Sequence, residues 1–427
     1  MTPRRDVIVI GAGAAGLMAA GRAAERGAHV LLLEKMGEAG KKILVTGQER
    51  CNVTNAAPLE TFLTAFGRNG PFLRNAFHRF FREELLALLR RYGVETQVER
   101  GGRIFPTSGR AADVRDALLR YATEHGATIR YHTAVQEILV EEERVTGVRP
   151  VGGETFPAAA VILATGGASW PGTGSTGDGY VMARDLGHTL TPLRPALVPL
   201  TVAEKARAKA LQGVSLRNVA CTLLESLPDG KDKVLPPPWP LPPTGEVLFT
   251  HFGLSGPLVL SLSLAAVDAV RAGKSVTLAL DLKPGMTFEE VRARLQREFE
   301  QYPQRKLPHL LRGWLPGSLA DELAQLTPIG VERPVFTIRA GERDELAMRL
   351  KDFRWRITGS LPLAAGMVTA GGVALKEVDP RSFASRRVAG LHLVGEVLDL
   401  AADTGGYNLQ AAFSSGYLAG EAAAGET

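Results

Sequence analysis

The sequence predicts an α/β protein whose main domain is a doubly wound parallel sheet with helices on both faces. Three observations support this class. Residues 6–34 have the pattern of a strand, a glycine-rich turn, a helix and a second strand. Apolar, strand-like segments followed by glycines recur at residues 159–164 and 391–394. A long stretch of different character, over residues 194–360, separates these last two segments. We therefore expect the chain to begin the main domain, leave it, and return to complete it.

The stretch over residues 6–34 has the features of a dinucleotide-binding βαβ unit. Its first five residues are apolar and rich in β-branched side chains, which is typical of a buried parallel strand. Gly11, Gly13 and Gly16 follow in G-x-G-x-x-G spacing, which suits a tight turn, close approach of a pyrophosphate, and close packing of helix on strand. The helix N-terminus offers N–H groups to phosphates. Glu34 ends the second strand, where a carboxylate accepts hydrogen bonds from an adenosine ribose. The motif predicts a Rossmann-like site for an ADP-containing dinucleotide and leaves NAD and FAD open.

Composition is that of a globular protein of two or three domains. The chain has 427 residues, of which 45% are hydrophobic and 22% charged. Its net charge of +5 is small for this length, and no basic run is interleaved with aromatic residues, so we expect no nucleic-acid partner. Cys51 and Cys221 are far apart and predict neither a disulfide framework nor a metal site. No apolar run is long enough for a signal peptide or a membrane span, so we expect a cytoplasmic protein without a membrane partner.

A second glycine-rich segment follows the apolar strand that ends at Ala164. Gly172, Gly174 and Gly177 formally repeat the G-x-G-x-x-G spacing. They lie too far from the strand for a tight turn, and no acid ends a following strand at the required distance. We interpret this segment as a loop that borders the first dinucleotide and not as a second fingerprint.

The intervening stretch is first β-rich and then helical. The strands that we expect there cover residues 197–202, 213–224, 246–251 and 275–282, and the helices residues 287–302, 307–315, 319–326 and 343–351. A proline-rich segment at residues 236–243 interrupts the strands. Because prolines cannot donate the hydrogen bonds of a central strand, this segment predicts an extended surface loop.

Several motifs together resemble the YhiN/BaiN-type NAD(P)/FAD-dependent oxidoreductases, and their layout is also similar to that of aminoacetone-oxidase-like flavoproteins. They span nearly the whole chain: Gly11–Gly16 with Glu34-Lys35, residues 40–55, residues 103–111, Ala164-Thr-Gly-Gly, residues 171–180, residues 250–257, Gly395-Glu396 and residues 404–410. The family usually has a glycine-rich turn before Arg50-Cys-Asn, whereas Gln48-Glu49 stand here. The resemblance implies an FAD-binding domain from residues 1–193 and 361–427, an inserted β-rich domain over residues 194–285 and a helical insertion over residues 286–360.

The resemblance and the motifs also name residues for the cofactor. Because the later glycine-rich stretches belong to a chain that returns to one site, they favour FAD over NAD. The expected FAD-binding residues are Gly11, Gly13, Ala14, Ala15, Gly16, Glu34, Lys35, Lys42, Thr46, Gly47, Arg50, Cys51, Asn52, Asn55, Val135, Ala164, Thr165, Gly166, Gly395, Glu396, Asp399, Gly406, Tyr407, Asn408 and Leu409. NADH or NADPH has no fingerprint of its own, so it would bind transiently over the flavin.

The sequence offers proton donors without deciding between them. His251 lies in a Phe-Gly-Leu-Ser-Gly-Pro loop of the insertion, and Tyr407 lies in the last glycine-rich stretch. A hydrogen-bonded structural histidine is an equally good interpretation of His251. The histidines show no metal-ligand spacing, and no Ser-His-Asp arrangement can be assigned from the sequence.

These observations predict an FAD-dependent oxidoreductase that acts on a small organic substrate. One version reduces a C=C or C=O bond with NAD(P)H, and the other oxidises an amine or aminoketone with oxygen. Two alternatives stay open: a flavin-dependent nucleic-acid modifying enzyme, suggested by the basic charge balance, and a non-catalytic flavin redox sensor that uses the proline-rich loop for docking. The substrate and the oligomeric state are left open.

Overall fold

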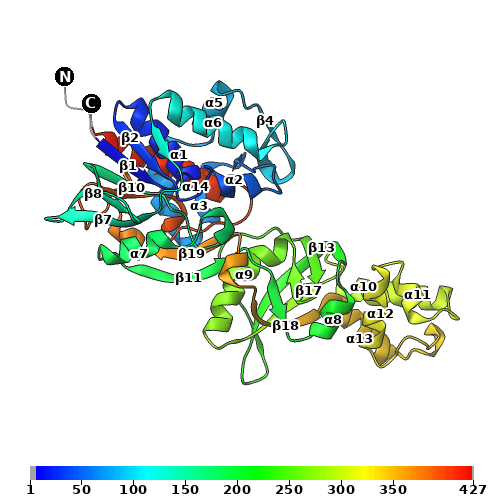
Figure 1. Ribbon diagram of the computed structural model, residues 1–427. Helices are drawn as coiled ribbons and strands as arrows, with labels where there is room; N and C mark the ends of the chain where they lie inside the picture. The colour runs from blue at the N-terminus through cyan, green and yellow to red at the C-terminus, as the bar shows by residue number, and fades with distance from the viewer. Residues whose placement is uncertain (1–5, 426–427) are drawn as a thin grey trace. The chain divides into compact units, whose positions relative to one another are not determined.

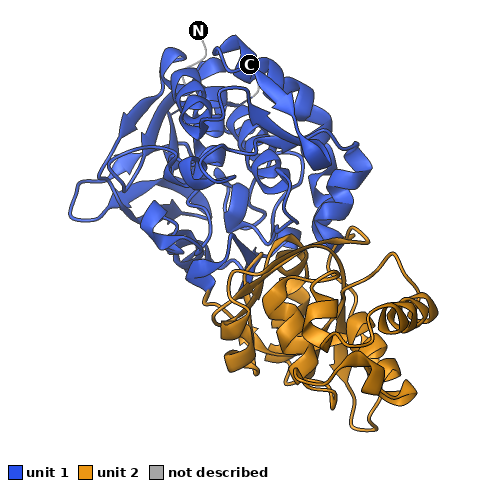
Figure 2. Ribbon diagram, turned by 90° about the vertical axis from the view of Figure 1, so that its right-hand side faces the viewer, with its two compact units in different colours: residues 1–196, 363–427 blue, residues 197–362 orange. Residues whose placement is uncertain are grey.

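The computed structural model describes residues 6–425, which divide into two compact units. The first unit extends through Ala196 and resumes at Leu363, and the second covers Leu197–Pro362 (Figure 2). In the described part of the chain no helix is both long and apolar enough to cross a membrane. We describe each unit by itself.

The first unit is built on a five-stranded parallel sheet in the order β20-β10-β1-β2-β6. The strands are β1 (Asp6–Ile10), β2 (His29–Leu33), β6 (Thr128–Arg130), β10 (Ala160–Leu163) and β20 (Leu391–Leu393). The chain builds outward from β1 on one side and then adds β10 and β20 on the other, so the strand order reverses beside β1. Ligands of open α/β sheets bind at the carboxyl ends of strands at such a point.

Helices from both ends of the chain cover this sheet. Helix α1 (Ala14–Glu25) and helix α14 (Tyr407–Ala424) lie side by side, blue against red in Figure 1. Two glycines of α14 allow the close approach: a Cβ at Gly416 would lie 2.3 Å from the carbonyl oxygen of Ala15, and one at Gly420 would lie 2.4 Å from that of Ala19. The C-terminal segment is therefore packed into the core of the domain that the N-terminal segment begins.

Smaller elements complete the first unit. The helices are α2 (Lys41–Val45), α3 (Leu59–Ala65), α4 (Arg74–Arg79), α5 (Arg82–Arg91), α6 (Ala111–Glu124) and α7 (Asp178–Asp185). Two three-stranded antiparallel sheets contain β3 (Thr54–Asn55), β5 (Arg103–Pro106) and β4 (Thr96–Val98), and β7 (Val135–Glu141), β8 (Arg144–Pro150) and β9 (Phe156–Pro157). Strands β11 (Leu190–Ala196) and β19 (Val368–Val373) form an antiparallel pair. Short 3-10 turns lie at η1 (Gly67–Leu73), η2 (Arg100–Gly102), η3 (Pro171–Thr173), η5 (Leu363–Ala365), η6 (Leu375–Glu377) and η7 (Gly395–Val397).

The second unit is a closed antiparallel barrel with helices between its strands in the chain. Its strands are β12 (Leu200–Val202), β13 (Ser215–Ser226), β14 (Asp232–Val234), β15 (Gly245–Thr250), β16 (Gly253–Ser255), β17 (Ser275–Asp281) and β18 (Phe353–Ser360). The order β13-β15-β16-β12-β18-β17 closes because β17 also pairs with β13, and β14 extends β13. Its core contains Trp355 and Phe249, whose ring centroids lie 5.3 Å apart.

Helix α9 contacts every strand of this ring. The helices of the second unit are α8 (Lys205–Ala210), α9 (Pro257–Arg271), α10 (Phe288–Gln301), α11 (Leu307–Leu311), α12 (Gly317–Gln325) and α13 (Ala340–Lys351), with a 3-10 turn at η4 (Val335–Thr337). The helical segment and the barrel belong to one compact unit, so the division of the insertion into two domains stays a prediction. The proline-rich segment lies outside the barrel strands and is anchored by Trp239, which is buried although Pro237 and Pro240 are exposed.

The predicted fold class is confirmed, because a parallel Rossmann-like sheet carries a separate antiparallel β insertion. Sequence patterning did not indicate that this insertion closes into a barrel.

Candidate functional site

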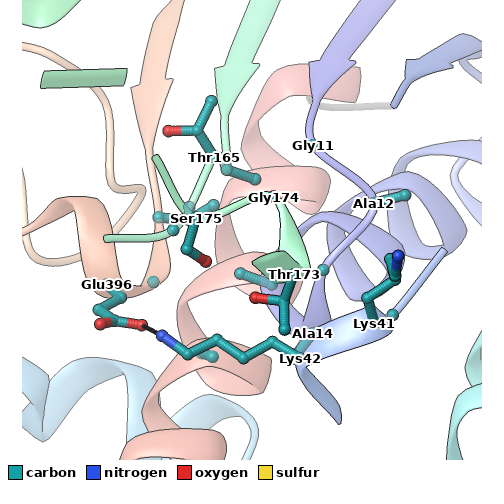
Figure 3. A pocket seen from close by; sticks show the side chains of 18 of the residues that line it. Gly11, Ala12, Ala14, Lys41, Lys42, Thr165, Thr173, Gly174, Ser175 and Glu396 are labelled. Carbon is teal, nitrogen blue, oxygen red and sulfur yellow. Dashed lines mark hydrogen bonds and ion pairs between the residues drawn. The ribbon is translucent and has the colours of Figure 1, made fainter. Parts of the chain in front are cut away.

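A pocket opens in the first unit at the carboxyl ends of β1, β2 and β10, where the strand order reverses. It has an empty volume of about 1420 Å³, part of which is open to solvent. The N-terminal ends of α1 and α14 and the loop before α7 also line it. Figure 3 shows residues from these distant segments around one space.

The glycines after β1 leave room for a ligand at the start of α1. Gly11 has a left-handed φ of +98°, and a Cβ there would lie 2.7 Å from the carbonyl oxygen of Ala164. At Gly16 a Cβ would lie 1.8 Å from the carbonyl oxygen of Gly11, so this glycine is required by packing. At Gly13 a Cβ would meet no atom within 4 Å. Gly13 is the N-cap of α1 and provides no side-chain hydrogen bond, so the first N–H groups of the helix have no capping side chain. This arrangement fits a pyrophosphate.

The Glu34 carboxylate is held in place beside this helix end. It is 8% exposed, its Oε2 accepts a hydrogen bond from the N–H of Ala12 at 2.7 Å, and its Oε1 accepts one from the N–H of Met36 at 2.8 Å. A carboxylate oxygen has two acceptor positions, so both oxygens retain capacity for a ribose hydroxyl.

An ion pair joins the end of β2 to the start of α7 along the same pocket. The Lys35 Nζ donates to Asp178 Oδ2 at 2.6 Å and also bonds the hydroxyl of Thr176. Burial raises the pKa of Asp178, but the hydrogen bonds from Lys35 and Thr176 outweigh burial and hold this pKa below its usual value. The glycine-rich loop at residues 171–177 therefore lies along the pocket that begins at Gly11.

A second ion pair lies where η7 meets α2. The Lys42 Nζ donates to Glu396 Oε2 at 2.7 Å and to the hydroxyl of Ser169 at 2.9 Å, and Figure 3 shows the Lys42 and Glu396 side chains pointing toward one another. Glu396 Oε1 accepts hydrogen bonds from the N–H of Thr369 at 2.8 Å and from Ser169 at 3.1 Å. Segments 354 residues apart in sequence thus meet at one carboxylate.

Most of the residues expected to bind the cofactor line this pocket. They are Gly11, Gly13, Ala14, Ala15, Glu34, Lys35, Lys42, Thr46, Val135, Ala164, Thr165, Gly166, Gly395, Glu396, Asn408 and Leu409. The buried hydroxyl of Thr165 has no hydrogen-bond partner among residues 6–425. The expected residues outside the lining are Gly16, Gly47, Arg50, Cys51, Asn52, Asn55, Asp399, Gly406 and Tyr407.

Several of the expected residues outside the lining bond other protein groups beside the pocket. Arg50 pairs with Glu99, and its guanidinium lies 4.3 Å from the centroid of the Phe105 ring. Asn52 Oδ1 accepts a hydrogen bond from the N–H of Ile104 at 3.2 Å. Asn55 Nδ2 donates to the carbonyl oxygen of Gly405 at 3.0 Å, so it fixes the loop before α14.

The loop before α14 depends on close backbone contacts. Gly406 has a φ of +95°, and a Cβ there would lie 2.5 Å from the carbonyl oxygen of Thr54. Asn408 Oδ1 accepts a hydrogen bond from the N–H of Ala402 at 2.9 Å, and Asn408 Nδ2 donates to the carbonyl oxygen of Ala402. Asp399 Oδ1 accepts the N–H of Gly371 at 3.1 Å. These contacts present the uncapped N-terminus of an 18-residue helix to the pocket.

The two candidate proton donors occupy different environments. Tyr407 is half-buried with its ring 4.8 Å from that of Phe62, and burial raises the pKa of its phenol. His251 lies in the second unit, in the exposed turn between β15 and β16, with its ring 4.9 Å from that of Phe252.

The structure also forms a Ser–His–Glu arrangement that the sequence did not reveal. Buried His188 lies with Nδ1 3.1 Å from Glu377 Oε2 and Nε2 2.9 Å from the hydroxyl of Ser385. The same hydroxyl accepts the N–H groups of Arg387 and Val388, each at 3.0 Å. Because these bonds occupy the oxygen that a nucleophile would need, the arrangement is a structural network.

Comparison with known proteins identifies the family. The family model described as "HI0933-like protein Rossmann domain" matches residues 5–422 of this chain. The 3-dehydro-bile acid delta(4,6)-reductase of Clostridium scindens is 34% identical over 418 residues, covering 97% of this chain and 98% of the relative. The ribosomal RNA dihydrouridine synthase of Escherichia coli is 31% identical over 416 residues, covering 97% and 96%. This chain belongs to the HI0933-like (YhiN/BaiN-type) flavoprotein family.

Solved structures agree on the fold. A flavocytochrome c3 fumarate reductase has a TM-score of 0.52 at 16% identity, with 99% of this chain and 78% of that chain covered. The 3-ketosteroid-delta4-(5alpha)-dehydrogenase of Rhodococcus jostii has a TM-score of 0.52 at 18% identity, with 100% and 98% covered.

The turn at Gln48 and Glu49, where the resemblance predicts more glycines, is left-handed without them. Gln48 and Glu49 have φ values of 57° and 66°, between Gly47 at 58° and Cys51 at 58°. Four residues of this turn are thus left-handed, although only one is a glycine. Cys51 is fully buried, and burial raises the pKa of its thiol to about 12, so the thiol stays protonated.

Other pocket-lining residues were not predicted from the sequence. They include Ala12, Lys41, Phe66, Asp178, Met182 and Met367. Lys41 had a detectable signal, because it precedes Lys42 in the same glycine-bounded segment, and it has no ion-pair partner in the described part of the chain. Phe66 and Met367 had none, since apolar side chains that reach a pocket from distant loops look like core residues in a sequence.

Proposed function

We propose that this protein is an FAD-dependent reductase of a C=C bond conjugated to a carbonyl group. The observation that carries the FAD assignment is the open space at Gly13, on the uncapped N-terminus of α1 and beside the fixed Glu34 carboxylate. This donor and acceptor set suits a pyrophosphate and its ribose. The pocket continues to the N-terminus of α14, which leaves room for the rest of a dinucleotide.

The reaction class is supported by what two full-length relatives share. A delta(4,6)-reductase of a 3-dehydro-bile acid acts on double bonds in conjugation with the 3-oxo group, and a dihydrouridine synthase saturates a double bond of uracil that is conjugated to a carbonyl. Addition of a hydride to the carbon of the double bond that is remote from the carbonyl is one chemistry that would serve both reductions, and it is the chemistry that we propose here. Reduction therefore stands ahead of amine oxidation here.

Named residues of this chain would hold FAD. The first N–H groups of α1 bind the pyrophosphate, with Gly13 leaving room, and Glu34 accepts the adenosine ribose hydroxyls. Lys42 and Glu396 would hold the ribityl chain, and the N–H groups that begin α14 would bind the ring, where the positive end of the helix dipole would stabilise negative charge. When bound, FAD supplies hydride transfer, and NADH or NADPH is the proposed transient donor.

We propose that one of the two candidates from the sequence, Tyr407 or His251, donates the proton. The phenol of Tyr407 is protonated at neutral pH, as a proton donor requires, and burial raises its pKa further. His251 is the other candidate that the sequence offers. Each has a simple test: loss of turnover in Tyr407→Phe or His251→Asn with retained FAD assigns the proton donor.

A ribosomal RNA substrate is the second candidate, because two relatives at 31% and 30% identity over nearly the full chain carry that activity in their names. The sequence predicted no nucleic-acid partner, but these relatives make an RNA substrate a candidate that needs its own experiment. RNA binding driven by phosphates weakens steeply with added salt.

A substrate screen tests the proposal. Purified protein should be yellow, bleach with NADH or NADPH, and convert an enone to the saturated ketone. A parallel arm with unmodified ribosomal RNA measures dihydrouridine, and an arm with aminoacetone and oxygen measures hydrogen peroxide. Protein that stays colourless after FAD is added contradicts the proposal, and peroxide from the amine without any enone reduction replaces it with the oxidase reaction.

A further inference from the structure

One of the four tryptophans is placed unlike the others. Trp170 is 43% exposed, whereas Trp239, Trp314 and Trp355 are 4%, 8% and 0% exposed. Single exposed apolar side chains are common at protein surfaces. What distinguishes Trp170 is its exposure together with its backbone conformation and its position between segments that reach the pocket.

The backbone at Trp170 is strained. Its φ of 57° and ψ of 58° are left-handed, and Pro171 follows. Bulky residues avoid this region, and a following proline restricts the residue before it to extended conformations. Hydrogen bonds impose the conformation: the N–H of Trp170 donates to the carbonyl oxygen of Ala364 at 3.1 Å, and the N–H and hydroxyl of Thr173 bond the carbonyl oxygen of Trp170 at 2.9 and 2.7 Å. Such strain persists mainly where it serves a functional site.

Trp170 lies just outside the pocket lining, and the residues on both sides of it are connected to the pocket. Ser169, on one side, is fully buried and bonds Lys42 and Glu396, which line the pocket. Thr173 and the two residues after it, on the other side, line the pocket themselves. The bond to Ala364 also places Trp170 beside the η5 turn. That turn leads to Met367, which is 47% exposed and lines the pocket as well.

We propose that Trp170 and Met367 form an apolar rim of the pocket and that Trp170 is a specificity-determining residue that contacts the flat ring face of the substrate. This inference rests on the proposed reductase function and narrows it to an uncharged, fused-ring conjugated ketone. Two of the three lysines that line the pocket are paired with carboxylates, Lys35 with Asp178 and Lys42 with Glu396, which leaves Lys41 as the lining lysine without an ion-pair partner among residues 6–425. The choice of an uncharged substrate therefore depends on the apolar rim. A flat apolar ring gains from contact with an indole face and a thioether.

The test uses the FAD-loaded protein, with androst-4-ene-3,17-dione as the fused-ring probe and cyclohex-2-enone as the single-ring probe. Trp170→Ala is expected to raise KM for androstenedione about tenfold, which corresponds to about 1.4 kcal/mol, with a smaller rise for cyclohexenone. Trp170→Phe should keep KM for androstenedione close to the wild-type value, and Met367→Ala should raise this KM by less than Trp170→Ala does. Val151→Ala, which truncates an exposed apolar residue outside the pocket lining, should change neither KM.

Trp170→Gly separates binding from folding. Glycine accepts the left-handed backbone, so this variant should melt no lower than Trp170→Ala while losing androstenedione affinity to the same extent. FAD content should be unchanged in all of these variants, because the proposed role of Trp170 concerns the substrate.

Fluorescence makes the rim testable without turnover. Androstenedione should quench the exposed indole of the wild-type protein and leave Trp170→Phe unquenched. No quenching in the wild type, or equal KM effects on both enones, overturns the rim. If Trp170→Ala binds androstenedione normally and loses binding only for a uridine-containing RNA, the choice of an apolar substrate is overturned. Failure of FAD binding or of enone reduction instead contradicts the proposed function, and the quenching experiment still decides the rim.

Discussion

At the residue scale, Gly13 and Gly16 have opposite reasons to be glycine. A side chain at Gly13 would enter open space beside α1, and its backbone φ of −81° accepts any residue. A side chain at Gly16 would collide with the backbone of Gly11. One glycine therefore reports on the ligand and the other on packing.

We predict that Gly13→Val yields a folded protein that does not retain FAD, because the valine fills the space assigned to the pyrophosphate. The ratio of absorbance at 450 nm to that at 280 nm measures this loss, and thermal unfolding of the FAD-free proteins measures folding. Gly16→Val is the matched control and should lower the melting temperature even without FAD. Full FAD content in Gly13→Val would refute the assignment.

The turn at Gln48 and Glu49 predicts a stability difference between two small substitutions. Both residues are left-handed and exposed, a conformation that costs most residues roughly 1–2 kcal/mol relative to glycine. Glu49→Gly should therefore be more stable than Glu49→Ala by about 1 kcal/mol in urea unfolding. Equal stability of the two variants would mean that this turn is not left-handed in solution.

The Lys35–Asp178 pair predicts a pH dependence. The pKa of Asp178 is lower in the folded protein than its usual value, so the unfolded chain takes up a proton first as the pH falls. The contribution of this carboxylate is thus present at neutral pH and is lost as the pH falls through the folded pKa. The melting temperature of Asp178→Asn should lie below that of the wild type at pH 7, and the two should converge below about pH 4. A gap that is constant with pH would contradict this role.

At the scale of elements, α1 and α14 are joined by glycine contacts that tolerate no added atoms. Gly416→Ala should destabilise the protein by about 1–3 kcal/mol, since its Cβ would lie 2.3 Å from a carbonyl oxygen of α1. Gly341→Ala, at an exposed position in α13 with open space around it, should instead be neutral or slightly stabilising. Denaturant unfolding measures both, and similar effects in the two helices would argue against the close packing.

The elements also show what sequence reasoning could reach. The βαβ unit over residues 6–34 was predictable because its glycines, helix and acid are local and strictly spaced. The closure of the barrel was not, because it depends on Cys221 facing Leu280 across two strands far apart in sequence. The same limit applies to Lys42 and Glu396: each was expected at the site, but their ion pair results from tertiary packing. Arg50 and Asn52 were expected at the cofactor because of the family resemblance, and this stays a prediction; in the structure Arg50 pairs with Glu99 and Asn52 accepts the N–H of Ile104.

At the scale of the whole molecule, both ends of the chain build one site. The first βαβ unit supplies the uncapped start of α1, and the last helix supplies a second uncapped start at the same pocket. This convergence is the physical reason for expecting a ligand as long as a dinucleotide.

The central claim is that this pocket holds FAD and uses it to reduce a conjugated C=C bond. The most direct measurement is anaerobic: the protein is reduced with one equivalent of NADPH or dithionite, and then mixed with one equivalent of cyclohex-2-enone or androst-4-ene-3,17-dione. The account predicts that the 450 nm absorbance returns as one equivalent of saturated ketone forms, and that Gly13→Val shows neither change. A flavin that stays reduced with both enones and is reoxidised only when oxygen is admitted would contradict it.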